Sequence, residues 1–156
     1  MICEIRPAKL NESGIIVKLL NKVTLYLHQR NINQWTYPWK PNEIDSEIRN
    51  KNIYVVTIEE LVVGTFSLRD MESNAALGIK TPDNLYLYRI ALLPEYQGKN
   101  LGVKIINYAF DVSKDSRKTL YLDCWAGNKK LKSFYSKAGS DYYGDFKEKD
   151  YMISVF

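Results

Sequence analysis

The stretch Leu85 to Gly102 reads LYLYRIALLPEYQGKNLG and decides how the rest of the chain is arranged. Its first half, Leu85 to Leu93, is apolar and aromatic without an internal glycine or proline, which predicts a buried strand. Pro94 ends that strand, because proline lacks the N–H that a sheet ladder needs. The second half is polar and glycine-bearing, and it leads into a segment with apolar residues at helical spacing. The sequence therefore predicts a strand, a tight turn and a helix N-terminus, in that order.

This order of elements creates a place for an anion. The first N–H groups of a helix lack internal partners and carry partial positive charge. Small residues in the turn let a phosphate approach the backbone. We therefore expect a phosphate or pyrophosphate over Gln97 to Gly102, with Lys99 and Lys104 adding charge. On this stretch alone, a glycine-containing turn without any ligand is the alternative interpretation.

Known phosphate motifs differ in how well they match this turn. A P-loop needs a hydroxyl residue where Val103 stands, and the dinucleotide fingerprint needs three glycines in another register. The run from Gln97 to Gly102 instead resembles the coenzyme-A loop of the GNAT superfamily of N-acetyltransferases, whose pattern is Arg/Gln-x-x-Gly-x-Gly/Ala. Asn100 replaces the middle glycine, and asparagine is the non-glycine residue that best accepts left-handed backbone angles.

A second block adds to the resemblance. The segment Leu122 to Gly139 is similar to the second GNAT signature, in which a strand ends at an Asn that opens a helix carrying a Tyr. Asn128 and Tyr135 occupy those places, and Ser140 stands where an aromatic residue is usual. Each also has a plain structural interpretation, Asn128 as a helix cap and Tyr135 as a core residue.

The resemblance implies an acetyl-CoA-dependent N-acetyltransferase in which a primary amine attacks the thioester directly. It implies that the main chain near Leu92 binds the pantetheine arm, that Asn128 also binds this arm, and that Tyr135 protonates the departing thiolate. The pyrophosphate would lie on Gln97, Gly98, Lys99, Asn100, Leu101 and Gly102. An acyl-CoA sensor of the same fold without turnover is the alternative.

The general base has no clear candidate in the sequence. Many GNAT relatives carry a Glu on the strand that corresponds to Leu85–Leu93, and that strand has no carboxylate here. The other candidates are Asp83, Glu95, Asp123 and His28, of which His28 is expected at the surface. The simplest hypothesis is that no single residue is the base and that the amine loses its proton to water. A backbone N–H near Leu92 or Leu93 would stabilise the oxyanion.

The chain is expected to form one domain over residues 1–156, with a mixed α/β fold. Helices should cover both faces of a twisted sheet of about six to seven strands, with a parallel pair after Leu85. Expected strands are Ile2–Arg6, Ile53–Ile58, Leu61–Arg69, Leu85–Leu93, Thr119–Trp125, Tyr142–Phe146 and Tyr151–Phe156. Expected helices run from an N-cap at Asn11 to about Gln29, over Asn42–Asn50, over Leu101–Ser113 and over Lys129–Ala138. A turn at Glu59-Glu60 and a bulge or close backbone approach at Gly64 complete the expectation.

The loop between the first two helices holds three aromatic residues, Trp35, Tyr37 and Trp39, among prolines. One interpretation is a loop pinned to the core by large rings. The other is one wall of a pocket for the amine acceptor. Both can hold together.

Composition limits the remaining classes. The net charge of +4 suits an anionic ligand, but the basic residues are scattered, which disfavours a dedicated nucleic-acid binder. Cys3 and Cys124 share no metal-ligand spacing and there is one histidine, so we expect no metal site. The chain has no apolar run of signal-peptide or membrane-spanning length. We therefore expect a cytoplasmic protein without a membrane partner. Its oligomeric state is expected to be a monomer or a homodimer.

Overall fold

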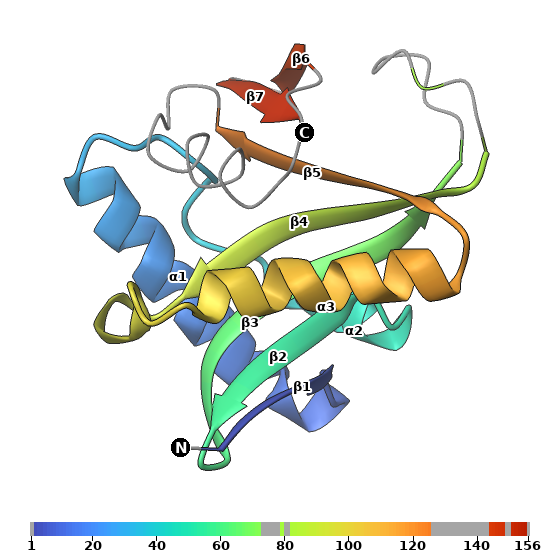
Figure 1. The fold of residues 1–156 in the computed structure, drawn as a ribbon. Coiled ribbons are helices and arrows are strands. Elements are labelled where there is room, and N and C mark those ends of the chain that lie inside the picture. Colours follow the sequence, from blue (N-terminus) through green and yellow to red (C-terminus); the bar gives the residue numbers. More distant parts are fainter. Residues whose placement is uncertain (1, 73–78, 80–81, 126–143, 149–150, 156) are drawn as a thin grey trace.

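The computed structural model describes residues 2–72, 79, 82–125, 144–148 and 151–155 (Figure 1). Its strands are β1 (Cys3–Pro7), β2 (Ile53–Ile58), β3 (Leu61–Met71), β4 (Asn84–Leu92), β5 (Thr119–Trp125), β6 (Gly144–Glu148) and β7 (Tyr151–Val155). The described helices are the 3-10 helices η1 (Leu10–Glu12) and η3 (Pro94–Tyr96) and the α-helices α1 (Ser13–Gln29), α2 (Pro41–Arg49) and α3 (Leu101–Asp115). The helix expected at Lys129–Ala138 lies outside the described residues.

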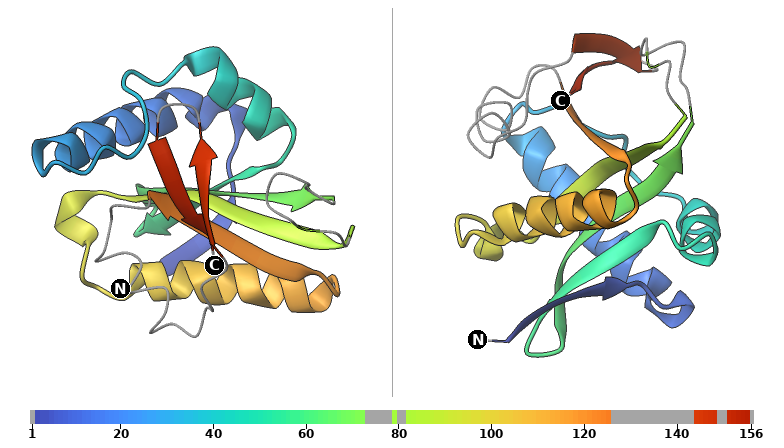
Figure 2. Two further views of the ribbon diagram at one scale, coloured as in Figure 1. Left: turned by 90° about the horizontal axis from the view of Figure 1, so that it is seen from above. Right: turned by 45° about the vertical axis from the view of Figure 1, so that its right-hand side comes forward.

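The strands form one mixed sheet in the order β1-β2-β3-β4-β5-β7-β6. β4 and β5 run parallel from the pair Asn84 and Thr119 to the pair Leu87 and Leu122, whereas the other neighbours are antiparallel. Helices α1 and α2 cover one face of the sheet and α3 covers the other (Figure 2). The expected mixed α/β architecture and its parallel pair are therefore confirmed.

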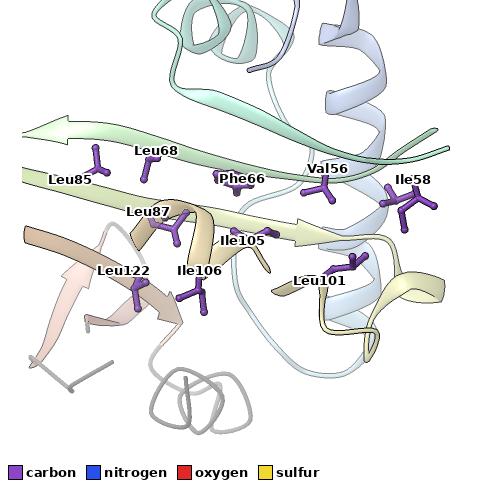
Figure 3. Packing of buried hydrophobic residues seen from close by; sticks show 12 residues of the cluster. Val56, Ile58, Phe66, Leu68, Leu85, Leu87, Leu101, Ile105, Ile106 and Leu122 are labelled. Carbon is purple, nitrogen blue, oxygen red and sulfur yellow. The ribbon is translucent and has the colours of Figure 1, made fainter. Parts of the chain in front are cut away.

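Two apolar clusters hold the helices against the sheet, one on each face. On the α3 face, Leu87 and Phe66 of the sheet pack with Leu101 and Ile105 of the helix (Figure 3). On the other face, the cluster joins residues of α1 and α2 to Val55 and Ala91 of the sheet, among others. β4 thus contributes side chains to both clusters, as a central strand does.

Several local predictions agree with the structure. β2 and β5 have the expected bounds, and Glu59 and Glu60 form the tight turn with φ of 50° and 69°. Gly64 lies where two backbones approach closely. A Cβ added there would be 2.5 Å from Leu92 Cδ2 and 3.0 Å from the Ala91 carbonyl oxygen, so a larger residue does not fit without a shift.

The N-terminal predictions need two corrections. Asn11 is not the N-cap of the first helix, because it lies inside η1, and α1 begins at Ser13. Glu12 organises this turn instead. Its carboxylate accepts a hydrogen bond from the Lys9 backbone N–H at 2.9 Å and one from each terminal nitrogen of the Arg6 guanidinium at 2.8 Å. Pro7 does not stop β1 but is its last residue, which the sheet tolerates because β1 is an edge strand.

The other elements differ only at their ends. α2 begins at Pro41, β3 runs on to Met71, α3 runs on to Asp115, and β6 lies two residues later than its expected strand at Tyr142–Phe146. Among the described residues, none of the helices has the length and apolar character that a bilayer crossing requires.

Candidate active site

β4 and β5 separate partway along their length, and the candidate site lies where they do. Their parallel pairing ends at Leu87 and Leu122. Beyond that point β5 pairs with β7, starting at Asp123, while β4 continues along β3 as far as Leu92. Figure 1 shows the two strands diverging toward their C-terminal ends. Main-chain groups in the second half of β4 therefore face a side that β5 has left.

A bulge in β4 marks the point of separation. Tyr88 pairs with Ser67 and Ala91 pairs with Thr65, so β4 has one extra residue across this interval. Arg89 is in the left-handed region with φ of 53°. Such a bulge bends its strand and increases the local twist, which carries β4 away from β5.

The bulge also decides which way the main chain points at the end of β4. The Leu93 N–H donates to the Val63 carbonyl at 2.9 Å, so it is engaged within the sheet. Because successive N–H groups of a strand alternate, the Leu92 N–H points away from β3, toward the side that β5 has left. The Leu92 carbonyl on that same side accepts the Gln97 side-chain amide at 3.1 Å.

The glycine-bearing turn has the geometry that a phosphate loop needs. Asn100 adopts φ 63° and ψ 15°, the left-handed conformation that the glycine of the GNAT pattern would supply, and it is the N-cap residue of α3. Gly98 has φ of 76°. Residues 97–100 are exposed, whereas Leu101 is 1% exposed and anchors the turn in the core. The turn thus presents the first N–H groups of a 15-residue helix to solvent.

The predicted loop residues Gln97 to Gly102 lie at the N-terminus of α3, and Leu92 is the last residue of β4, the strand that precedes them. Lys99 lies with its ammonium 5.7 Å from the centre of the Tyr96 ring. Asn128 and Tyr135 lie outside the described residues, as does the side chain of Asp123.

A second group of side chains, which sequence reasoning missed, surrounds Arg89. Its guanidinium donates to Glu47 and, at 3.0 Å, to Glu43, both on α2. The Tyr88 hydroxyl donates to the second oxygen of Glu47 at 2.8 Å. The Trp39 ring centre lies 5.0 Å from the guanidinium carbon. We call Arg89, Glu43, Glu47 and Tyr88 the Arg89 clamp.

Only one side of the clamp could be predicted from the sequence. Glu43 and Glu47 are four residues apart, so a helix places them on one side, but nothing nearby identifies their partner. Arg89 is 42 residues from Glu47, and its left-handed backbone gives no sequence signal. The pKa of Tyr88 is raised well above its ordinary value, first by burial and then by the negative charge of Glu47. This hydroxyl therefore stays protonated and keeps its role as a donor.

The aromatic loop is pinned to the core by two of its three rings. Trp35 and Trp39 meet edge to face with ring centres 5.7 Å apart, and both pack on the α1/α2 cluster. Trp39 is fixed further by hydrogen bonds from its backbone N–H and its indole N–H to α1, at 2.8 and 2.9 Å. Tyr37 is 46% exposed. The pinned-loop interpretation is thus confirmed for the two tryptophans.

Two polar side chains at this loop stand out, His28 from α1 and Gln34 from the loop itself. His28, expected at the surface, is half-buried, and its Nε2 lies 3.1 Å from the Trp35 carbonyl oxygen, so it anchors the loop to α1. Gln34 is 8% exposed, and its Oε1 has no hydrogen-bond partner among the residues that the structure describes. A buried acceptor of this kind normally has a partner.

Of the remaining base candidates, Asp83 lies far from the end of β4, whereas Glu95 follows that end closely, within η3. Asp83 precedes the first residue of β4, about 30 Å from Leu92 at the usual rise per residue. Glu95 is exposed and 3.8 Å from Lys22 of α1. Throughout the described ranges, no three His, Cys, Asp or Glu residues gather in a way that could hold a metal ion.

Comparisons with known proteins agree with this geometry. The sequence profile described as "Acetyltransferase (GNAT) family" matches residues 20–139. Uncharacterized N-acetyltransferase YesJ of Bacillus subtilis (strain 168) is 26% identical over 146 residues, which cover 88% of this chain and 81% of YesJ.

Solved structures share the fold over nearly the whole chain. A GNAT-family acetyltransferase from Streptococcus agalactiae 2603 superposes with a TM-score of 0.82 at 18% identity, covering 98% of this chain and 92% of the other. The structure of yncA from Salmonella typhimurium, solved with its cofactor acetyl-CoA, superposes with a TM-score of 0.74 at 15% identity, covering 99% of this chain and 92% of yncA. Since the family profile spans well over half of the chain, this protein belongs to the acetyltransferase (GNAT) family.

Proposed function

We propose that the protein transfers an acetyl group from acetyl-CoA to a primary amine. One observation carries the proposal: an exposed turn with left-handed Asn100 opens α3 shortly after the end of β4, the strand that has parted from β5, in a chain of the acetyltransferase family. The fold-sharing yncA was solved with acetyl-CoA as its cofactor, which supports the same co-substrate here.

The described residues fit this co-substrate. The pyrophosphate would lie on the main chain of Gln97 to Gly102, where free helix N–H groups and exposed Lys99 and Lys104 supply positive charge. The pantetheine arm would run along the side of β4 that β5 has left, bonding the main chain at Leu92. Asn128 remains our proposed second contact for this arm.

The reaction we propose needs no covalent enzyme intermediate. The amine nitrogen forms a bond to the thioester carbonyl carbon, the oxygen becomes an oxyanion, and the carbon–sulfur bond then breaks. Of the two main-chain donors considered for the oxyanion, the Leu93 N–H is used by Val63, which leaves the outward-facing Leu92 N–H. The thiolate that leaves takes a proton, for which Tyr135 is our proposed donor.

The amine must lose a proton before it attacks, because an amine of pKa ~10 is mostly protonated at neutral pH. Asp83 lies at the opposite end of β4 from Leu92, and Glu95 is exposed and close to Lys22. Glu43 and Glu47 are both engaged by Arg89. We therefore keep the hypothesis that water takes this proton and that no single side chain is the base.

The acceptor would approach from the α1/α2 face, beside Trp35, Tyr37 and Trp39. Two observations support this placement. Tyr37 is exposed, and the buried Oε1 of Gln34 has no partner among the described residues, so it could accept an N–H of a bound amine. Our proposal also takes residues 1–156 as one catalytic domain that acts in the cytoplasm as a monomer or homodimer.

An assay with acetyl-CoA and a panel of primary amines tests the function. We expect release of free thiol that depends on the amine, together with an N-acetylated product of matching amount. Calorimetry should show binding of acetyl-CoA, and thermal shift should show stabilisation by acetyl-CoA rather than by ATP-magnesium. Binding without product for every amine would favour the acyl-CoA sensor, and the absence of binding would refute both.

A further inference from the structure

We propose that Glu47 is a positioning residue for acetyl transfer, because through Arg89 it fixes the β4 bulge that aims the Leu92 N–H at the thioester. This inference rests on the proposed function. It concerns residues of α2 and of the β4 bulge, which lie outside the phosphate turn Gln97–Gly102.

Arg89 needs a restraint from outside its own backbone. A residue with a side chain pays a free-energy cost in the left-handed region, and Arg89 has φ of 53° there. Its guanidinium is held by two carboxylates one helical turn apart on α2, with the Trp39 and Tyr88 rings 5.0 and 5.4 Å away. The clamp therefore fixes the side chain of a residue whose backbone is unfavourable by itself.

Glu47 is the inner carboxylate of the clamp and Glu43 the outer one. The side chain of Glu47 is 17% exposed and that of Glu43 is 46% exposed. Glu47 also accepts the Tyr88 hydroxyl, so it ties α2 to two consecutive residues of β4. Since an exposed ion pair contributes little, we assign most of the restraint to Glu47.

The bulge controls the main chain beyond it. With the extra residue, Ile90 and Leu92 pack with the α3 cluster and Leu93 bonds Val63. Without it, each later residue would pair one position earlier, and the Leu92 N–H would turn toward Val63 inside the sheet. The Leu92 N–H thus faces the reacting side because β4 has this extra residue.

Loss of Glu47 should loosen the bulge without erasing it, because the packed side chains of Ile90 and Leu92 keep the register. We expect Glu47→Gln to lower kcat by about 10-fold or more, since small displacements of a reacting group are costly. KM for acetyl-CoA should stay within about threefold, because the pyrophosphate turn is untouched. Arg89→Gln should have a similar effect, and the double variant should be no worse than the single ones.

Glu12→Gln is the matched control. Glu12 is 12% exposed, pairs with Arg6 and holds a turn remote from β4. It should lower the free energy of unfolding by a similar amount and leave kcat unchanged. Equal kcat losses in Glu12→Gln and Glu47→Gln would overturn the inference, because the effect would then be general destabilisation.

Hydrogen exchange of residues 88–93 separates this inference from the proposed function. We expect faster exchange there in Glu47→Gln than in the wild type, with α3 unchanged. If the wild type acetylates no amine, the proposed function fails, yet faster exchange would still support the clamp's hold on the bulge. Unchanged exchange, with or without a fall in kcat, would refute the positioning role.

Discussion

The Arg89 clamp lies before the last residues of β4 and the phosphate turn follows them, and the two are built in opposite ways. The turn is local: residues 97–102 and the helix that follows supply all of it. The clamp is assembled from α2 and β4, whose contacting residues are 42 and 46 positions apart. Both contain a non-glycine residue in the left-handed region, Asn100 in the turn and Arg89 in the clamp. Asparagine accepts that conformation by itself, whereas arginine needs partners.

The largest effect is expected at Gly102, the second residue of α3. Gly102→Val places a branched side chain where we propose that the pyrophosphate meets the helix N-terminus, and we expect acetyl-CoA affinity to fall by about 100-fold or more. Isothermal calorimetry on the folded variant measures it. Gly14→Val is the control, because Gly14 is also the second residue of its helix and a Cβ there meets nothing within 4 Å. Wild-type affinity in Gly102→Val would move the phosphate elsewhere.

The next largest change in acetyl-CoA affinity is expected at Asn100. Substitutions there test whether the left-handed backbone angle alone is what ligand binding requires. Asn100→Gly keeps φ of 63° available and should leave affinity for acetyl-CoA within about threefold. Asn100→Val places a β-branched residue there and should weaken binding by about 10-fold through loss of the turn. Equal affinities in the two variants would show that the left-handed angle is not what the ligand needs.

The contrast between turn and clamp explains what the sequence could reveal. Gly98, Asn100 and the apolar stripe after them lie within one short window, so the turn and the helix that follows it were predictable. The pairing of Arg89 with Glu43 and Glu47 requires the sheet order and the placement of α2, which no local pattern contains. Asn11 was misassigned for a related reason, because the capping group Glu12 is organised by Arg6 from β1. Among the described residues, strand and helix positions were predictable almost throughout, because hydrophobic periodicity and turn residues indicate them.

A smaller change in kcat/KM is expected for the candidate bases, which belong to neither the phosphate turn nor the Arg89 clamp. Single replacements Asp83→Asn and Glu95→Gln should each lower kcat/KM by less than about 10-fold, below the usual contribution of a general base. His28→Asn and Asp123→Asn belong to the same series. Log kcat/KM should rise with pH toward the ionisation of each acceptor amine, with a midpoint that moves between acceptors. A midpoint fixed near neutral pH and removed by one of these replacements would identify a dedicated base.

The smallest effect is a change in the pH dependence of the free energy of unfolding, caused by Tyr88. It would show whether the clamp also stabilises the fold. Burial, followed by the charge of Glu47, raises the pKa of Tyr88 in the native protein above the ordinary value of 10. An unfolded Tyr88 therefore loses its proton near pH 10 while the native one keeps it. Above about pH 10 the native state binds more protons than the unfolded state, so the free energy of unfolding falls as pH rises, by at most about 1.4 kcal/mol per pH unit for one group.

Tyr88→Phe removes this titration, so its free energy of unfolding should fall less steeply than that of the wild type from about pH 10 upward. Urea unfolding at several alkaline pH values measures the difference. Some slope should remain, because burial also raises the pKa of Tyr54, with a smaller contribution from Tyr108. Tyr37→Phe, at a side chain that is 46% exposed, is the control and should keep the wild-type slope. Equal slopes in the wild type and Tyr88→Phe would mean that Tyr88 is not held protonated by its surroundings, and the clamp would then reduce to the two carboxylates and Arg89.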